Sequence, residues 1–362
     1  MADYTSEEVL NKKERGESLA GANLVRISLR GQDLTGIQLK GANLQYADLT
    51  DANLNGADLA GADLSYANLN GARIKDADLS KCHLTGVDMT GAMLAGSNLA
   101  GAVLDDSKLG NCDLSGARLT GAKVRRVSGA QLQAPFTNCN EADFEEARLE
   151  EANFRGASMI RSNFSKAVLT KSDLSGSDLK EAVLTRINLE ESALFSAGFV
   201  EATMIKANLK GTRSSGADFA LSNLTGADLS GGAFTKSVFR GAEMSQAILN
   251  VGNFAECDLS YSRMTYATAE SSSFVRASFV SANLMEAKLK KCHISGGDLT
   301  GAKMSGCNLL GSDLSGSKLN GADLSRANVG GADFSRADMT GATIVGTDFA
   351  DAKLVGTKHP AG

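Results

Sequence analysis

Cysteine, histidine and aspartate are the residues of this chain that could support metal binding, nucleophilic catalysis or acid–base chemistry. The six cysteines are widely spaced, without a CxxC pair: Cys82, Cys112, Cys139, Cys257, Cys292 and Cys307. The three histidines are His83, His293 and His359. This spacing indicates neither a zinc site nor a disulfide framework. A phosphate-binding loop and a dinucleotide-binding fingerprint are also missing from the sequence. We therefore expect no metal, no cofactor and no small-molecule substrate.

A five-residue repeat positions these residues along almost the whole 362-residue chain. From Leu19 to Leu354 in steps of five, 63 of 68 positions are Leu, Ile, Met, Phe or Val, and the residue two before each is mostly small. A helix would rotate such residues by about 140° per step and scatter them around every face, and a flat strand would alternate them between two faces. The chain must therefore turn once per repeat.

Four turns of about 90° close a coil of 20 residues in which each large apolar residue and the small residue two before it face one interior. Two large residues per side would overpack that interior, which explains the large and small pairing. Stacked coils can hydrogen-bond as parallel strands do. With four repeats in each coil, the 68 repeats predict an all-β, parallel β-helix of about 17 coils.

The motif Ala-(Asp/Asn)-Leu recurs almost unaltered at residues 47–49, 57–59, 62–64, 227–229 and 322–324. Through these residues the chain resembles the pentapeptide-repeat family over nearly its whole length. The resemblance implies a right-handed quadrilateral β-helix, but not one function. The stretch LNKKERGESLAGANL, residues 10–24, also resembles the entry into arrays associated with bacterial type VI secretion clusters.

The ends of the repeat define the expected organisation. Thr5-Ser6-Glu7-Glu8 has the pattern of a capping box, so residues 1–16 are expected to form a short helix that covers the first coil. Residues 17–357 form the predicted β-helix and residues 358–362 a tail.

One sustained irregularity interrupts the pattern at residues 125–140, where three successive apolar centres are replaced by Gly129, Ala134 and Cys139. We expect a distorted coil or a protruding loop there, dividing the β-helix into two lobes. In gyrase-protecting relatives, loops extruded from a coil bind the partner, and this resemblance marks three residues as candidate partner-binding residues: Arg125, Arg126 and Phe136.

Two further surfaces are candidates for partner binding. The last repeats predict an open C-terminal face for docking or homodimer formation, bordered by Met339, Ile344, Phe349 and Leu354. The alternative is that residues 355–362 fold over this face. Outward apolar residues also form an expected collar, on successive sides of one coil, at Phe195, Val200 and Ile205.

Spacing of 20 residues predicts stacking of aromatic rings. Two interior ladders are expected, Phe199 with Phe219 and Phe239, and Phe234 with Phe254 and Phe274. Tyr46 and Tyr66 are expected to form an exposed pair.

The repeat also predicts which reactive side chains point into the interior and which point to solvent. Five cysteines take the small inward position and should be buried, whereas His83 and His293 should point outward. Outward side chains diverge from a solid core, so the sequence predicts a protein that is not an enzyme. The formal net charge of −5 predicts no direct binding to nucleic acid. The sequence shows no apolar leader and no apolar run of about 20 residues, so we expect a protein of the cytoplasm that does not span a membrane.

The leading functional hypothesis is a rigid scaffold that presents surfaces to protein partners. A sharper version of it is an accessory of a bacterial secretion system. The alternative is a topoisomerase-binding protein that imitates DNA, as in gyrase-protecting or gyrase-inhibiting relatives. Aspartates recur every 40 residues, about 9.6 Å apart, from Asp178 to Asp338. Duplex DNA carries one charge per roughly 1.7 Å, so this row is too sparse to imitate it.

Overall fold

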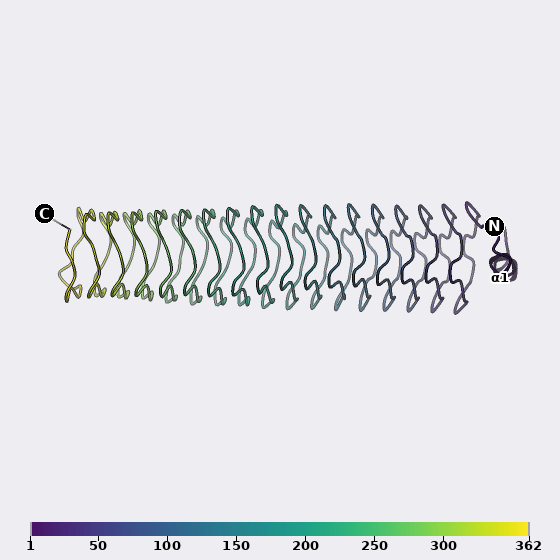
Figure 1. Ribbon diagram of the computed structural model, residues 1–362, viewed down its shortest axis with the longest axis horizontal. Coiled ribbons are helices and arrows are strands. Elements are labelled where there is room, and N and C mark those ends of the chain that lie inside the picture. Colours follow the sequence, from purple (N-terminus) through teal and green to yellow (C-terminus); the bar gives the residue numbers. More distant parts are fainter. Residues whose placement is uncertain (1, 361–362) are drawn as a thin grey trace. The chain divides into compact units, whose positions relative to one another are not determined.

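A short helix covers the first coil. The computed structural model describes residues 2–360, and the helix within them is α1 (Ser6–Glu14). Its capping box is present: the Thr5 hydroxyl accepts a hydrogen bond from the Glu8 N–H (3.3 Å), and Glu8 Oε2 accepts one from the Thr5 N–H (2.7 Å). Ser6 Oγ donates to the Ser28 carbonyl (2.7 Å), and Val9 is fully buried. The predicted capping helix is confirmed (Figure 1). Residue 1 of that segment, like residues 361–362 of the predicted tail, lies outside the described residues.

The chain divides into two compact units, residues 1–183 and 184–362, and each is described separately. In both units every fifth residue forms a parallel β-bridge with the residue 20 positions later in the chain. These bridges run from Asn23–Asn43 to Asn163–Val183 in the first unit and from Asn188–Asn208 to Asp338–Lys358 in the second. Among residues 2–360 every bridge is isolated, so the sheets consist of single bridge residues on each side of a coil. Each unit is a right-handed quadrilateral β-helix, which confirms the predicted fold class.

Four backbone hydrogen bonds repeat along each side of a coil, and one of them runs from the Gly21 N–H to the Lys40 carbonyl (2.9 Å). The Leu24 N–H donates to the Asn43 carbonyl (2.7 Å), and the Asn43 N–H donates to the Ala22 carbonyl (2.9 Å). Within the coil, the Ala22 N–H donates to the Leu19 carbonyl (3.1 Å) and closes the turn. The residue two after each central apolar position, here called the corner residue, has a left-handed backbone, as in Gly21 (φ +69°). Glycine is common at corners because it adopts this conformation without strain.

Residues 125–140 do not form the predicted distorted coil or loop. The bridges Ser128–Arg148, Gln133–Asn153 and Asn138–Ser158 continue the regular pattern through them. The large and small positions have exchanged roles in two of these repeats: Val127 and Leu132 are fully buried at positions that are small in most other repeats. A Cβ built on Gly129 would lie 2.7 Å from Leu149 Cδ2, so the leucine of the next coil uses the space that glycine leaves. The large apolar side chain comes from the other position, so no distortion is needed.

The predicted division into lobes at this segment is also wrong, because the two units meet between Val183 and Leu184. The repeat pattern is unbroken there, with Ala182 and Leu184 both fully buried.

Phenylalanines stack in the interior at the spacing of the coils. In the second unit, Phe199, Phe219 and Phe239 lie with ring centroids 4.8 and 4.9 Å apart, and their planes are within 5°. The second ladder repeats this geometry at 4.9 and 5.1 Å and comprises Phe234, Phe254 and Phe274. Both predicted ladders are confirmed, and all six rings are fully buried.

The last coil of the second unit is less covered than the coils before it. Ile344, Phe349 and Leu354 are only partly buried, whereas Met339, one repeat before Ile344, is buried. These residues border a hollow of about 110 Å³ that His359 and Pro360 also line. The segment after Val355 therefore reaches the edge of this face and leaves its three apolar side chains partly exposed.

Candidate functional site

Corner residues carry side chains that distinguish one coil from the next. Tyr66 (φ +60°) and Phe136 (φ +57°) adopt the left-handed conformation and are largely exposed, Phe136 to 72%. Each side chain leans over the glycine corner of the next coil. A Cβ built on Gly86 would lie 2.7 Å from Tyr66 Cδ1, and one on Gly156 would lie 2.7 Å from Phe136 Cε1. At these two corners the glycine 20 residues later leaves room for the bulky side chain.

An exposed aromatic stack occupies one corner of the first unit. The rings of Tyr46 and Tyr66 are parallel within 12°, with centroids 5.4 Å apart, which confirms the predicted pair. The Arg26 guanidinium lies 5.6 Å from the Tyr46 centroid, within the range of a cation–π contact. Arg26 lies on one side of the stack and Gly86 on the other, and Tyr46 and Tyr66 remain 51% and 56% exposed.

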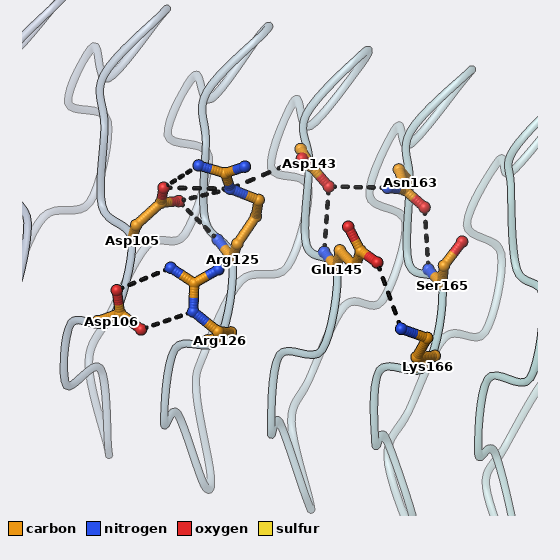
Figure 2. Close-up of polar contacts among 9 residues, drawn as sticks. All are labelled: Asp105, Asp106, Arg125, Arg126, Asp143, Glu145, Asn163, Ser165 and Lys166. Atoms are coloured by element: carbon orange, nitrogen blue, oxygen red, sulfur yellow. Dashed lines mark hydrogen bonds and ion pairs between the residues drawn. The ribbon is translucent and has the colours of Figure 1, made fainter.

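Arg125 is paired with an aspartate of the preceding coil. Its Nε lies 3.2 and 3.1 Å from the two Asp105 carboxylate oxygens, its Nη2 contacts Asp105 Oδ2, and its backbone N–H donates to Asp105 Oδ1 (3.1 Å) (Figure 2). Asp105 is only 6% exposed. Burial raises the pKa of the Asp105 carboxyl, but the hydrogen bonds from Arg125 lower it more, so the pKa lies below its ordinary value. On the other side, Arg125 Nε is 3.9 Å from Asp143 Oδ2.

Arg126, the corner residue next to Arg125, takes part in a second charge ladder. Its guanidinium makes two hydrogen bonds of 2.8 Å to the Asp106 carboxylate, and these lower the pKa of Asp106. Two coils further on, Lys166 Nζ is 2.8 Å from Glu146 Oε1. The same Nζ is 3.7 Å from Glu145 Oε1 (Figure 2). The hydrogen bond and charge of Glu146 raise the pKa of Lys166. Positive and negative corner residues thus alternate from coil to coil and satisfy one another.

The structure does not gather the three candidates of residues 125–140 into one site. Arg125 and Arg126 engage Asp105 and Asp106, while Phe136 lies at another corner of the unit, over Gly156. Phe136 is the member of the three that presents an exposed apolar surface.

The predicted collar is similarly dispersed. Phe195 is exposed and has the Arg213 guanidinium 5.8 Å from its ring centroid, whereas Val200 and Ile205 are partly buried. The three residues are five apart and therefore follow one another around successive sides of a coil. They present three separate apolar points to solvent.

The reactive side chains point where the repeat predicts. All six cysteines are buried, and burial raises the pKa of Cys82, Cys139 and Cys257 to about 12. Such thiols are protonated and poor nucleophiles at neutral pH. His83 and His293 are exposed, on the opposite side of the wall from Cys82 and Cys292. Within residues 2–360, no three His, Cys, Asp or Glu side chains gather in a way that could hold a metal ion.

No helix in the described part of the chain has the length and apolar character needed to cross a membrane.

One surface feature was not found from the sequence. In the second unit a hollow of about 410 Å³ opens over two corner glycines in consecutive coils, Gly211 and Gly231. The sequence signal is a pair of corner glycines 20 residues apart, between the large corner residues Glu191 and Val251. Large outward residues predict an exposed surface from the sequence, whereas a corner glycine predicts only a turn.

A family model described as pentapeptide repeats, in eight copies, matches overlapping stretches of the chain. These stretches cover residues 22–121, 137–250 and 253–356, which is most of the sequence. No curated protein matches the sequence.

Solved structures of similar proteins include HetL, a pentapeptide repeat protein involved in heterocyst differentiation regulation in Nostoc sp. strain PCC 7120. It is 25% identical, with 66% of this chain and 90% of HetL covered and a TM-score of 0.20. QnrB1, a plasmid-mediated fluoroquinolone resistance protein, is 22% identical over 52% of this chain and 90% of its own, with a TM-score of 0.30. A pentapeptide repeat protein of the Arabidopsis thaliana thylakoid lumen is 28% identical over 34% of this chain and 73% of its own, with a TM-score of 0.20.

Proposed function

Because this chain belongs to the pentapeptide-repeat family, we propose that it is a non-enzymatic scaffold whose corner side chains bind protein partners. The observation that carries the proposal is the division between a filled interior and diverging corners. Central residues such as Leu49 and Leu229 are fully buried, while Tyr66, Phe136 and Val251 project from corners into solvent. Catalysis requires several groups to converge on one reacting atom, and diverging corners are better suited to contact a large partner surface.

The presence of bulky corner residues supports this proposal. An exposed Phe136 gains little from burial, and its left-handed backbone is unfavourable for a bulky L-residue. Glycine at the same place would avoid both costs, as Gly116 and Gly156 do in the adjacent coils. Large aromatic residues are frequent energetic anchors of protein interfaces. A partner that covers the Phe136 ring would explain why the residue is not glycine.

Affinity capture with corner variants tests the scaffold. The immobilised chain, a Tyr46→Gly/Tyr66→Gly variant and a Phe136→Gly variant are compared for the proteins they retain from an extract of the native cells. We expect at least one retained protein to be lost with a corner variant whose circular dichroism and melting temperature are unchanged. If all three chains retain the same proteins in the same amounts, these corners are not the binding surface. If none is retained at all, the scaffold proposal fails.

We propose the cytoplasm as the location, because six buried protonated thiols are compatible with a reducing compartment. An accessory role in a bacterial secretion system is a finer proposal that depends on the resemblance of residues 10–24, which comprise the end of α1 and the first repeats. Co-purification with components of a secretion apparatus would support it, and genes far from any such cluster would count against it.

The topoisomerase-binding alternative receives less support from the charges. In the acidic row of the second unit, Lys318 Nζ is 3.6 Å from Asp298 Oδ2 and Lys358 Nζ is 3.1 Å from Asp338 Oδ2. Each of these lysines therefore neutralises part of the acidic row, whereas a protein that imitates DNA needs a continuous row of negative charges. A gyrase supercoiling assay at micromolar protein would revive this alternative by showing inhibition or protection.

Self-association through the C-terminal face is a further proposal, and the partly exposed Ile344, Phe349 and Leu354 support it. Sedimentation of the chain and of a Phe349→Ser variant tests it. A monomer at all concentrations would remove the homodimer.

A further inference from the structure

A trough on the second unit has a floor of small residues and two different ends. It is lined by Glu190, Glu191, Lys210, Gly211, Ser230, Gly231, Ile248, Asn250 and Val251 and encloses about 410 Å³. Its residues come from four consecutive coils, and the feature is here called the Gly211–Gly231 trough. Its acidic end is at Glu190 and Glu191, and its apolar end is at Ile248 and Val251.

The floor exists because two corners in succession are glycine. Gly211 (φ +66°) and Gly231 (φ +65°) are flanked along the same corner by Glu191 and Val251. A Cβ built on Gly231 would have no heavy atom within 4 Å, so it would point into the empty trough. Larger side chains at the two flanking corners rise above this floor.

The apolar end is unfavourable as it stands. Val251 has φ +59° and is 71% exposed. A left-handed backbone is a genuine outlier for a β-branched residue, because its branched side chain crowds the backbone. Ile248, a bridge residue on the same rim, is also exposed. The Val251 side chain is too exposed in the isolated chain for its burial to offset this strain. Burial of the same side chain against a partner would offset it.

The acidic end is lined by two glutamates and one lysine. Glu190 is half-buried and its Oε2 accepts a hydrogen bond from Asn208 Nδ2 (3.2 Å), which holds the carboxylate in place. Glu191 and Lys210 are both exposed, and the three lining side chains together have a formal charge of about −1 at pH 7. A positive side chain of a partner fits this end better than a negative one.

We propose that the Gly211–Gly231 trough binds an extended segment of a protein partner that has a lysine or arginine at one end and an apolar side chain four residues away. From Glu191 to Val251 is three coil steps, or about 14 Å at roughly 4.8 Å per step. Four residues of extended chain span about 14 Å at roughly 3.4 Å per residue, and side chains four apart share one face. The side chain midway between them lies over the floor and must be small. This proposal rests on the scaffold function and names the chemistry of one partner segment.

The test uses peptides displayed on phage and selected on the immobilised full chain. Selected peptides are then measured against three proteins: the wild type, Gly231→Tyr, which fills the trough, and the control Gly321→Tyr. Gly321 is also a left-handed corner of the second unit, and a Cβ built on it likewise has no heavy atom within 4 Å. The chain itself places tyrosine at left-handed corners, at Tyr261 and Tyr266, so both variants should fold.

We expect selected peptides to combine a basic and an apolar residue four positions apart, and to bind Gly231→Tyr at least about tenfold more weakly than Gly321→Tyr. Val251→Ser should weaken binding by about tenfold at any salt concentration. Glu190→Gln with Glu191→Gln should remove most of the salt dependence.

Three outcomes would overturn the proposal: no enrichment over an unrelated immobilised protein, equal binding to both tyrosine variants, or selected peptides without the basic and apolar pair. Partners retained in the affinity capture that bind Gly231→Tyr normally would leave the scaffold function intact and reject only the trough.

Discussion

Residues 44–63 and residues 124–143 are coils of the same unit that fill their interiors in opposite ways. The first follows the motif, with Leu49 and Leu54 at the large positions and Ala47 and Ala52 at the small ones. In the second, Gly129, Ala134 and Cys139 stand at the large positions, while Val127, Leu132 and Thr137 stand at the small ones. Both coils keep the same bridges to their neighbours. The backbone therefore accepts the large interior side chain from either position without a change in its bridges.

The two coils differ at their corners as well. Tyr46 stacks on Tyr66 and Arg26, whereas Arg126 and Glu141 take part in ion pairs with Asp106 and Arg161. Corner chemistry varies because it faces solvent, while the interior positions of both coils are buried. The following predictions test this comparison, from the largest expected effect to the smallest.

Leu132→Ala should lower the free energy of unfolding by about 2–5 kcal/mol, because a fully buried side chain is replaced by a cavity. Leu54→Ala in the regular coil is the matched control and should cost a similar amount. Chemical denaturation of both variants measures the difference. A loss below about 1 kcal/mol for Leu132→Ala alone would mean that the exchanged coil is not packed as described.

Gly129→Leu restores the motif residue and should nevertheless destabilise the chain by about 1–3 kcal/mol. The reason is that Leu149 already occupies the space, and a Cβ built on Gly129 would also lie 3.8 Å from Leu132 Cβ. Because residues 129 and 132 are in contact, the double variant Gly129→Leu/Leu132→Ala should lose less than the sum of the two single variants. Strict additivity in urea denaturation would contradict the exchange of roles.

Asp105→Asn should cost about 1–3 kcal/mol at neutral pH, because the nearly buried carboxylate accepts hydrogen bonds from the Arg125 side chain and backbone. The folded-state pKa of Asp105 is below its ordinary value. Its stabilisation is thus present above about pH 4 and is lost as the pH falls toward the folded-state pKa. Melting temperatures from pH 7 to pH 2 should fall more for the wild type than for the variant. Asp106→Asn, at an exposed pair, is the control and should show a smaller effect.

Phe136→Gly should change the free energy of unfolding by less than about 0.5 kcal/mol, because the ring is exposed and glycine adopts the left-handed corner without strain. Thermal unfolding followed by circular dichroism measures it. A large loss of stability would show that Phe136 supports the coil, which would remove the reason for a partner.

The period of five residues was sufficient to predict which residues lie inside. It placed Leu49, Cys82 and the phenylalanine ladders in the interior and His83 outside, because a single frame persists along the chain. The exchange at residues 127–139 was not predicted because only the central positions, such as Gly129 and Ala134, were considered. The large residues two positions earlier, Val127 and Leu132, were left out. Volume is shared between the two positions, so neither position alone predicts the packing.

The candidate surfaces were less predictable. Arg125 and Arg126 are candidate partner-binding residues in the sequence, and their ion pairs are not evident there because the acceptors, Asp105 and Asp106, lie 20 residues earlier in the chain. The trough was missed because its floor consists of missing side chains, at Gly211 and Gly231. The boundary at Val183 has no sequence signal, since the repeat continues across it.

The bridge between each residue and the one 20 positions later also restricts how genes for such chains can change in length. Insertion or deletion of five residues inside a unit would preserve the interior pattern but rotate every downstream corner by a quarter turn relative to the upstream coils. Only a duplication or loss of 20 residues would keep a corner such as that of Tyr46 and Tyr66 in line. Natural length variants that retain the same partner should therefore differ by whole coils.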